Sequence, residues 1–164
     1  MRQTAGRSKS VFRVQEALRQ AGLEIEVVEL ADSTRTAELA AQAIGTSLGS
    51  IAKSLVFMAD GKPALVLVAG DRRASPSKVA RALGAGEVRL AAADEVRAAT
   101  GYAVGGVPPV GHATPMETLV DASLARFEVV HAAAGSPHAV FPIRFADLLR
   151  LTGGRLTDIA EGGA

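Results

Sequence analysis

Hydrophobic and polar residues alternate along the chain with two different periods, one typical of helices and the other of strands. Between Val11 and Ala21 the apolar residues recur at steps of three and four, and Ser10 and Gly22 are placed to begin and end an amphipathic helix. Residues 25–30 alternate acidic and apolar side chains, which predicts a half-buried strand. Further helices are predicted to end at Gly45, Gly84 and Gly101, and a last helix is predicted over residues 145–151.

The most specific strand signal lies in the middle of the chain. Two apolar runs, residues 51–59 and 63–69, are separated by Asp60-Gly61, a dipeptide that favours a tight hairpin turn. Residues 118–120 and 128–132 have the composition of later strands. Because helices and strands are interspersed without a regular βαβ rhythm, the sequence predicts an α/β fold in which a mixed, mostly antiparallel sheet is flanked by helices.

Composition restricts the domain count and the classes of function. The 164 residues, 48% of them apolar, suffice for one sizeable core, so we predict a single domain at residues 11–160 after a flexible tail of residues 1–10. Eighteen basic and seventeen acidic residues leave a net charge of +1, so any nucleic-acid contact must be local. The absence of cysteine excludes disulfides, thiolate metal sites and a cysteine nucleophile.

No apolar segment approaches the roughly 18 residues that a membrane span requires. The stretch Met1–Ser10 is polar and basic and lacks the apolar core of a signal peptide. We therefore expect a cytoplasmic protein without a membrane partner.

Several motifs in the chain do not support the chemistry that they suggest. Gly45-Thr46-Ser47-Leu48-Gly49 matches the G-x-S-x-G pattern of serine esterases, but it follows a helix and precedes a strand, the reverse of the esterase order. A helix stop and connecting loop is the better interpretation, and an esterase that uses Ser47 remains a rival. The three histidines lack the spacing of a helical zinc pair, and no nucleotide-binding glycine motif is present, so neither a metal nor an organic cofactor is expected.

Lys53 has an unusual setting. Strand alternation places it on the same face as Ile51, Leu55 and Phe57, which is an apolar environment for an ammonium group. It is either a lysine at the sheet edge whose stem lies along the apolar surface while its head reaches water, or a fixed cation that polarises a substrate carbonyl.

The segment 101–112 is the second unusual feature, because it holds four glycines and two prolines. Glycines allow backbone N–H groups to approach a ligand closely, and prolines restrict the conformations of the turn. The segment is therefore either a cradle for an oxyanion or carbonyl, or a tight structural connection.

Taken together, Ile51-Ala52-Lys53-Ser54-Leu55-Val56-Phe57 and Gly101-Tyr102-Ala103-Val104-Gly105-Gly106-Val107-Pro108-Pro109-Val110-Gly111 resemble the YbaK-like family of aminoacyl-tRNA deacylases. This family is related to the editing domain inserted in bacterial prolyl-tRNA synthetases. The resemblance extends from about Val11 to Ala160. It implies a mixed-sheet α/β fold whose pocket hydrolyses the ester between an amino acid and the terminal ribose of tRNA.

The resemblance also implies roles for individual residues. Lys53 matches the family's lysine, and Gly105 with Pro109 matches its Gly-x-x-x-Pro loop, whose backbone amides position the aminoacyl carbonyl. Lys53 and Gly105 are thus the predicted catalytic positions. No protein side chain is implied as general base, and the substrate's ribose hydroxyl helps to activate water. Substrate contacts are expected from a further set of residues: Thr34, Ser54, Gly106, Pro109 and His112.

The amino acid removed is less clearly indicated. The serine and aspartate expected in the cysteinyl-tRNA deacylase branch are not matched in residues 132–140, which speaks against cysteine. Hydroxyls at residues 33–36 favour alanine, serine or threonine as cargo on a tRNA-Pro-type substrate, although the same hydroxyls also serve as helix caps. His112 either contacts the acceptor end or is an ordinary surface residue.

The expected partner is the acceptor end of a mischarged tRNA, with a transient contact to an aminoacyl-tRNA synthetase and no contact with DNA. Because the chain shows no synthetase or anticodon-binding module, editing in trans is expected. Phosphate contacts are predicted from basic residues after the hairpin, which otherwise form a solvated face: Arg72, Arg73, Lys78 and Arg81. The rival from another class is a non-catalytic module that binds aminoacyl-tRNA or a nucleotide in the same pocket.

Overall fold

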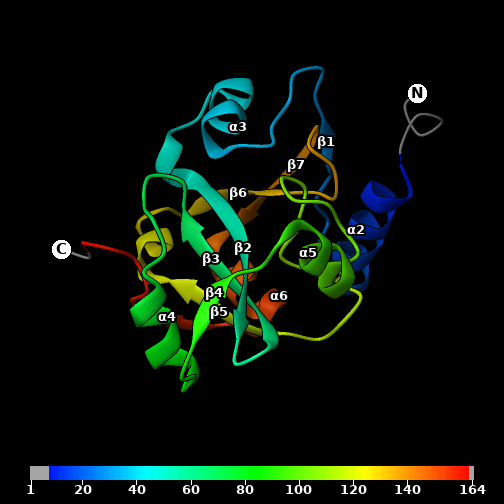
Figure 1. The fold of residues 1–164 in the computed structure, drawn as a ribbon. Helices are drawn as coiled ribbons and strands as arrows, with labels where there is room; N and C mark the ends of the chain where they lie inside the picture. Colours follow the sequence, from blue (N-terminus) through cyan, green and yellow to red (C-terminus); the bar gives the residue numbers. More distant parts are fainter. Residues whose placement is uncertain (1–7, 163–164) are drawn as a thin grey trace.

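The predicted hairpin forms the centre of the sheet in the computed structural model, which describes residues 8–162 (Figure 1). Strands β2 (Ile51–Ala59) and β3 (Lys62–Ala69) pair antiparallel along their whole length. Asp60 and Gly61 connect them with φ values of 48° and 83°. Both values lie in the left-handed region that a two-residue hairpin turn requires, so the Asp-Gly prediction is confirmed.

The described residues contain an eight-stranded sheet with the order β1-β7-β6-β2-β3-β5-β8, and β4 also pairs with β2. Strands β6, β5 and β8 run parallel to their neighbours β2, β3 and β5, and the other four pairings are antiparallel. This confirms a mixed sheet with an antiparallel majority. The remaining strands are β1 (Val28–Glu29), β4 (Val88–Leu90), β5 (Glu117–Asp121), β6 (Val129–Ala133), β7 (Ala139–Arg144) and β8 (Arg155–Thr157).

Within residues 8–162, five α-helices flank the sheet, namely α2 (Lys9–Gln20), α3 (Ala37–Ile44), α4 (Pro76–Leu83), α5 (Ala93–Thr100) and α6 (Phe145–Thr152). Helices α3, α4 and α5 end, as predicted, at glycines whose backbone has the left-handed conformation: Gly45, Gly84 and Gly101. Helix α2 begins earlier than predicted, because the side chain of Ser8 rather than Ser10 caps it by accepting from the amide of Val11. Lys9 and Ser10 thus belong to this helix, and residues 1–7 of the predicted tail lie outside the described residues.

Alternate residues of β2 contact two different sets of helices (Figure 1). Ala52 and Val56 belong to the main core, to which α2, α5 and α6 contribute apolar side chains. On the opposite face, Ile51 packs with α3 and Phe57 packs with α4. The odd-numbered face of β2, which includes Lys53, therefore lies toward α3 and α4.

Strands β4, β7 and β8 were not predicted from the sequence, and β1 is shorter than the predicted strand over residues 25–30. In the predicted segment 25–30, the side chain of Gln15 donates to the carbonyl of Ile25 and accepts from the amide of Val27. A helix side chain thus replaces a ladder partner at the start of this segment. Within the described residues, no helix is long and apolar enough to cross a bilayer.

Asp121 fixes the end of β5 from a position that is 2% exposed. Its carboxylate accepts from the amide of Ser123 at 2.9 Å and from the amide of Ile159 at 2.8 Å. It thereby joins the short 3₁₀ helix η2 (Ala122–Arg126) to the C-terminal segment.

We predict that Asp121→Ala lowers the free energy of unfolding by about 2 kcal/mol, because the buried amide of Ile159 and the partly buried amide of Ser123 lose their acceptor. Urea denaturation of the variant and the wild type measures this difference. The control is Asp32→Ala in an exposed loop, which should stay within about 0.5 kcal/mol of the wild type. Equal effects of the two substitutions would contradict the prediction.

Candidate functional site

The sheet is interrupted along one edge of β2. Strand β6 pairs with this edge at Ile51 and Ala52, and β4 pairs with it at residues 57–59. Two hydrogen bonds show toward which edge of β2 the peptide groups point. The carbonyl of Ile51 accepts from the amide of Gly70 on the β3 side, and the carbonyl of Val56 accepts from the amide of Ala91 on the β4 side. Odd-numbered residues direct their peptide groups at β3 and even-numbered residues direct theirs at the interrupted edge. The peptide groups of Ser54 therefore face the break between β6 and β4.

A cavity of about 300 Å³ lies at this break, and it brings together residues that are distant in sequence. Lys53 and Gly105, the two predicted catalytic positions, both line it, as do Thr34 and Ser54. The rest of the wall comes from β2 itself, the residue after β3, the start of α3 and the segment before it, the loop before β5, and the strands β6 and β7: Arg35, Thr36, Ala37, Glu38, Ala40, Ile51, Ala52, Leu55, Gly70, Val104, Val107, His131, Ala132, Ala133 and Val140.

Lys53 stands between this cavity and a larger, open groove of about 1,060 Å³. Its ammonium donates to the backbone carbonyl of Arg72 at 2.6 Å. Burial, together with the positive charge of Arg73, lowers the pKa of Lys53, whereas the carboxylates of Glu38 and Asp71 act to raise it. The ammonium is thus partly desolvated, and one of its three donors has a fixed acceptor.

Gly105 brings the backbone of the loop close to the segment before α3. Its φ is +91°, and a Cβ atom at this position would lie 3.0 Å from the Cβ of Arg35. The neighbouring amide of Gly106 donates to the carbonyl of Ala103, and its carbonyl accepts from Gly135. Among the described residues the amide of Gly105 has no hydrogen-bond acceptor, and the same holds for the amides of Val104 and Val107, so the loop presents several unpaired amides at the cavity.

Three predicted substrate contacts do not line the cavity, namely Gly106, Pro109 and His112. His112 forms a 2.7 Å hydrogen bond between its Nε2 atom and the carbonyl of Pro108, and burial lowers the pKa of its ring. Tyr102 closes the same loop by donating to the carbonyl of Gly111 at 2.8 Å. These residues hold the shape of the loop that presents Gly105.

Thr34 is buried and joins the segment before α3 to the turn between β6 and β7. Its amide and its hydroxyl both donate to the carbonyl of Pro137, at 2.5 Å and 3.1 Å. Two other polar atoms of residues in the wall, Oγ of Ser54 and Nδ1 of His131, are buried without a hydrogen-bond partner among the described residues. Burial also lowers the pKa of His131, which favours its neutral form.

Sequence reasoning did not identify Glu38 or His131 as cavity residues, and it placed Arg35 in the pocket wall only as part of the segment 33–36. Arg35 lies between hydroxyl residues that also suit helix caps. Glu38 lies in the first turn of α3, where the helix dipole stabilises a carboxylate whether or not it has a role in a site. His131 was considered only as a metal ligand. Its position follows from the pairing of β6 with Ile51 of β2, which no local pattern indicates.

The predicted phosphate contacts separate into two groups. Arg72 and Arg73 line the open groove. Lys78 instead directs its ammonium at the carboxylate of Asp158 and, at 2.8 Å, at the carbonyl of Ala160, which occupies its donors. Arg81 lines neither the cavity nor the open groove.

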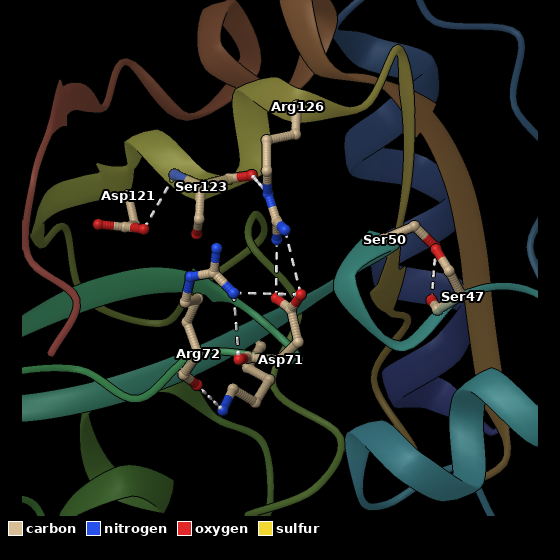
Figure 2. Close-up of polar contacts among 8 residues, drawn as sticks. Ser47, Ser50, Asp71, Arg72, Asp121, Ser123 and Arg126 are labelled. Atoms are coloured by element: carbon tan, nitrogen blue, oxygen red, sulfur yellow. Dashed lines mark hydrogen bonds and ion pairs between the residues drawn. The ribbon is translucent and has the colours of Figure 1, made fainter. Parts of the chain in front are cut away.

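Ser47 has none of the surroundings of an esterase nucleophile. It is exposed and lies outside the cavity, and its carbonyl accepts from the hydroxyl of Ser50 at 2.9 Å (Figure 2). Its role as the residue before the short helix η1 (Leu48–Ser50) agrees with the interpretation of this motif as a connecting loop.

Residues 31–151 match the model of the aminoacyl-tRNA editing domain. The chain belongs to this family. The matched segment contains Lys53, Gly105 and every other residue that lines the cavity. The resemblance inferred from the lysine strand and the glycine-proline loop is therefore confirmed.

Known relatives of this editing domain include free-standing and inserted forms. This chain is 38% identical to the uncharacterised protein YwhH of Bacillus subtilis over 121 residues, which are 73% of this chain and 76% of that protein. It is 39% identical to the proline–tRNA ligase of Solidesulfovibrio magneticus over 104 residues, which are 63% of this chain but only 18% of the ligase. A solved structure described as a candidate trans-editing enzyme for prolyl-tRNA synthetase is 46% identical, with a TM-score of 0.90 over 96% of this chain and 100% of that one.

We predict that the side-chain amine of Lys53 titrates below the range of an exposed lysine, because burial disfavours its charged form. Glu38→Gln should lower this pKa further, since the carboxylate of Glu38 raises it. Any function that needs the ammonium is consequently lost as pH rises through the lowered pKa. NMR titration of labelled lysine measures the value, and a Lys53→Met variant assigns the signal. A pKa at or above that of free lysine would contradict the prediction.

Proposed function

We propose that this editing domain hydrolyses mischarged aminoacyl-tRNA in trans and removes a small amino acid from a tRNA-Pro-type substrate. The observation that carries the proposal is the shared cavity, in which the ammonium-bearing Lys53 and the free amide of Gly105 line the same space of about 300 Å³. Family membership supports an aminoacyl ester as the substrate. The proline–tRNA ligase relatives and the related solved structure support tRNA-Pro as the carrier.

The reaction is the hydrolysis of an ester. The oxygen of water bonds to the carbonyl carbon as that water gives up a proton, and the carbonyl oxygen becomes negatively charged. The tetrahedral intermediate then breaks its bond to the ribose oxygen, which takes up a proton in place of the one that the water released. An ammonium and a backbone N–H that are fixed before the reaction stabilise this oxyanion without reorganisation. In our proposal Lys53 and Gly105 supply these two donors, and the neighbouring hydroxyl of the terminal ribose activates the water.

The size of the cavity supports a small cargo. Its volume is at the lower end of the range of about 300–1,000 Å³ typical of ligand sites. Small and β-branched residues form much of its wall, among them Ala132, Ala133, Val107 and Val140. A pocket of this kind admits alanine, serine or threonine and excludes bulkier side chains, as a second sieve after a synthetase must do.

The open groove provides a place for the acceptor end of the tRNA. It shares Glu38, Lys53, Leu55 and Gly70 with the cavity, so a ribose held at Lys53 would have the amino acid on one side and the nucleotide chain on the other. Arg72 and Arg73 line the groove and suit phosphate contacts. A transient contact with prolyl-tRNA synthetase would deliver the charged tRNA to this face.

We predict that the purified chain deacylates at least one of the tRNAs charged with alanine, serine or threonine, and that Lys53→Met lowers the rate by about 100-fold or more because an oxyanion donor is lost. Release of the labelled amino acid measures the rate. Ser47→Ala is the matched control and should keep the wild-type rate. If the chain binds the charged tRNA and protects its ester, it is instead a non-catalytic binding module. If no substrate is hydrolysed faster than in buffer, the enzymatic proposal is wrong.

We also predict that Arg73→Ala raises KM for aminoacyl-tRNA and makes it less dependent on salt. Each lost phosphate contact should reduce the slope of log affinity against log salt by about 0.7 for a single strand. The control is Arg81→Ala, because Arg81 is exposed and lies outside the groove, and it should leave the slope unchanged. An unchanged slope for Arg73→Ala would place the tRNA elsewhere.

A further inference from the structure

The acceptor of the Lys53 ammonium is a backbone carbonyl, so its position depends on the turn that carries it. This turn follows β3, and it is closed by a hydrogen bond from the amide of Arg72 to the carbonyl of Ala69 at 2.9 Å. The carbonyl of Arg72 then receives the ammonium at 2.6 Å. A lysine side chain has a flexible four-carbon stem, so a shift of this carbonyl would move or release the charge.

An ion pair fixes the turn from outside the cavity. The carboxylate of Asp71, the residue before Arg72, accepts two hydrogen bonds from the guanidinium of Arg126, at 3.1 Å and 2.7 Å. The guanidinium of Arg72 approaches the same carboxylate at 3.3 Å, so Asp71 lies between two arginines (Figure 2). A carboxylate held by a two-pronged guanidinium has a defined orientation as well as a defined position.

Arg126 is itself held on η2. Its Nε atom donates to the carbonyl of Ser123 at 2.6 Å (Figure 2). Its guanidinium lies 4.9 Å from the ring centre of Phe127. The amide of Ser123 in turn binds the buried carboxylate of Asp121. A continuous series of contacts therefore connects the end of β5 to the turn that carries the Arg72 carbonyl.

Gly49 provides the space for this ion pair. A Cβ atom at Gly49 would lie 2.9 Å from Oδ2 of Asp71, 3.1 Å from Nη2 of Arg126 and 2.8 Å from the ring of Phe127. The second glycine of the Gly-x-Ser-x-Gly motif thus has a structural reason to be glycine that does not involve a nucleophilic serine.

We propose that the Asp71–Arg126 ion pair is a positioning device for Lys53: it sets the Arg72 carbonyl, which orients the ammonium at the boundary of the cavity and the open groove. The proposal rests on the deacylation proposed above. Both side chains are about one-third exposed, at 31% and 37%, and such pairs contribute little to stability. Their geometric effect on the turn is therefore the consequence to test. Arg126 lines neither the cavity nor the groove, so an effect of its substitution on deacylation is indirect, and its contact with Asp71 is the one that leads to the Arg72 carbonyl and Lys53.

The test compares Arg126→Gln with Arg89→Gln in the full chain. Arg89 forms an exposed two-pronged pair with Glu95, at 2.7 Å and 2.8 Å, on β4 and α5, and is a matched control. We expect Arg126→Gln to lower kcat for deacylation about tenfold with KM within twofold of the wild type, and to speed proton exchange of the Lys53 ammonium in NMR spectra. Arg89→Gln should change neither quantity.

Asp71→Asn breaks the same pair from the other side and should likewise lower kcat and speed exchange of the Lys53 ammonium, so a folding defect confined to one variant does not leave the question open. Asp71 itself lines the open groove, so KM is compared only for Arg126→Gln. The proposal is overturned if the folded variants keep kcat within twofold, or if kcat falls while exchange of the Lys53 ammonium is unchanged. If the wild type deacylates no charged tRNA, the proposed function fails, and ammonium exchange alone then decides whether the pair positions Lys53.

Discussion

A single ammonium group on an apolar strand face is the constraint around which the site is organised. Burial disfavours the charge of Lys53, so the fold must supply compensation close to it. The compensation comes from two separate elements, the first turn of α3 through Glu38 and the turn after β3 through Asp71 and the Arg72 carbonyl. These groups favour the charged form, and among the described residues no carboxylate forms an ion pair with the ammonium. An ammonium in this state can still interact with a substrate oxygen.

The break in the sheet gives this charge its access to a ligand. Unpaired strand edges usually expose backbone groups that invite aggregation. In this editing domain the unpaired stretch of β2 is confined to a few residues between β6 and β4, and the segments around Thr34 and Gly105 cover it. The same gap that would weaken a continuous sheet therefore becomes one wall of the cavity. The strand pairing on either side keeps Lys53 and Ser54 in register.

Much of the fold could be predicted from the sequence because the signals concerned are local. The Asp60-Gly61 turn and the glycines at the ends of α3, α4 and α5 act on their immediate neighbours, and each was found where expected. Strand β4 has three residues and is stabilised by pairing with β2, while β7 is an apolar run that contains Pro142. Neither has a pattern that distinguishes it from a loop before its partner is known.

In the site, too, local signals could be predicted and contacts between distant segments could not. Alternation along β2 was enough to place Lys53 on an apolar face, and the resemblance added Gly105 as its counterpart. The capture of Lys78 by Asp158 and of His112 by the Pro108 carbonyl depends on tertiary structure and could not be anticipated. His131 enters the cavity for a similar reason, since the parallel pairing of β6 with β2 joins segments about 80 residues apart.

The hydrogen bonds between Thr34 and Pro137 join residues that are 103 positions apart. They link the segment before α3 to the turn between β6 and β7, and both regions contribute to the cavity wall. During synthesis, a chain that has emerged only as far as η2 already carries the lysine and the glycine-proline loop, but it lacks two of the strands that enclose them. Under the proposed function, hydrolytic competence would then arise only when the fold is nearly complete. The unfinished protein would carry the lysine and the loop without the walls that select a substrate.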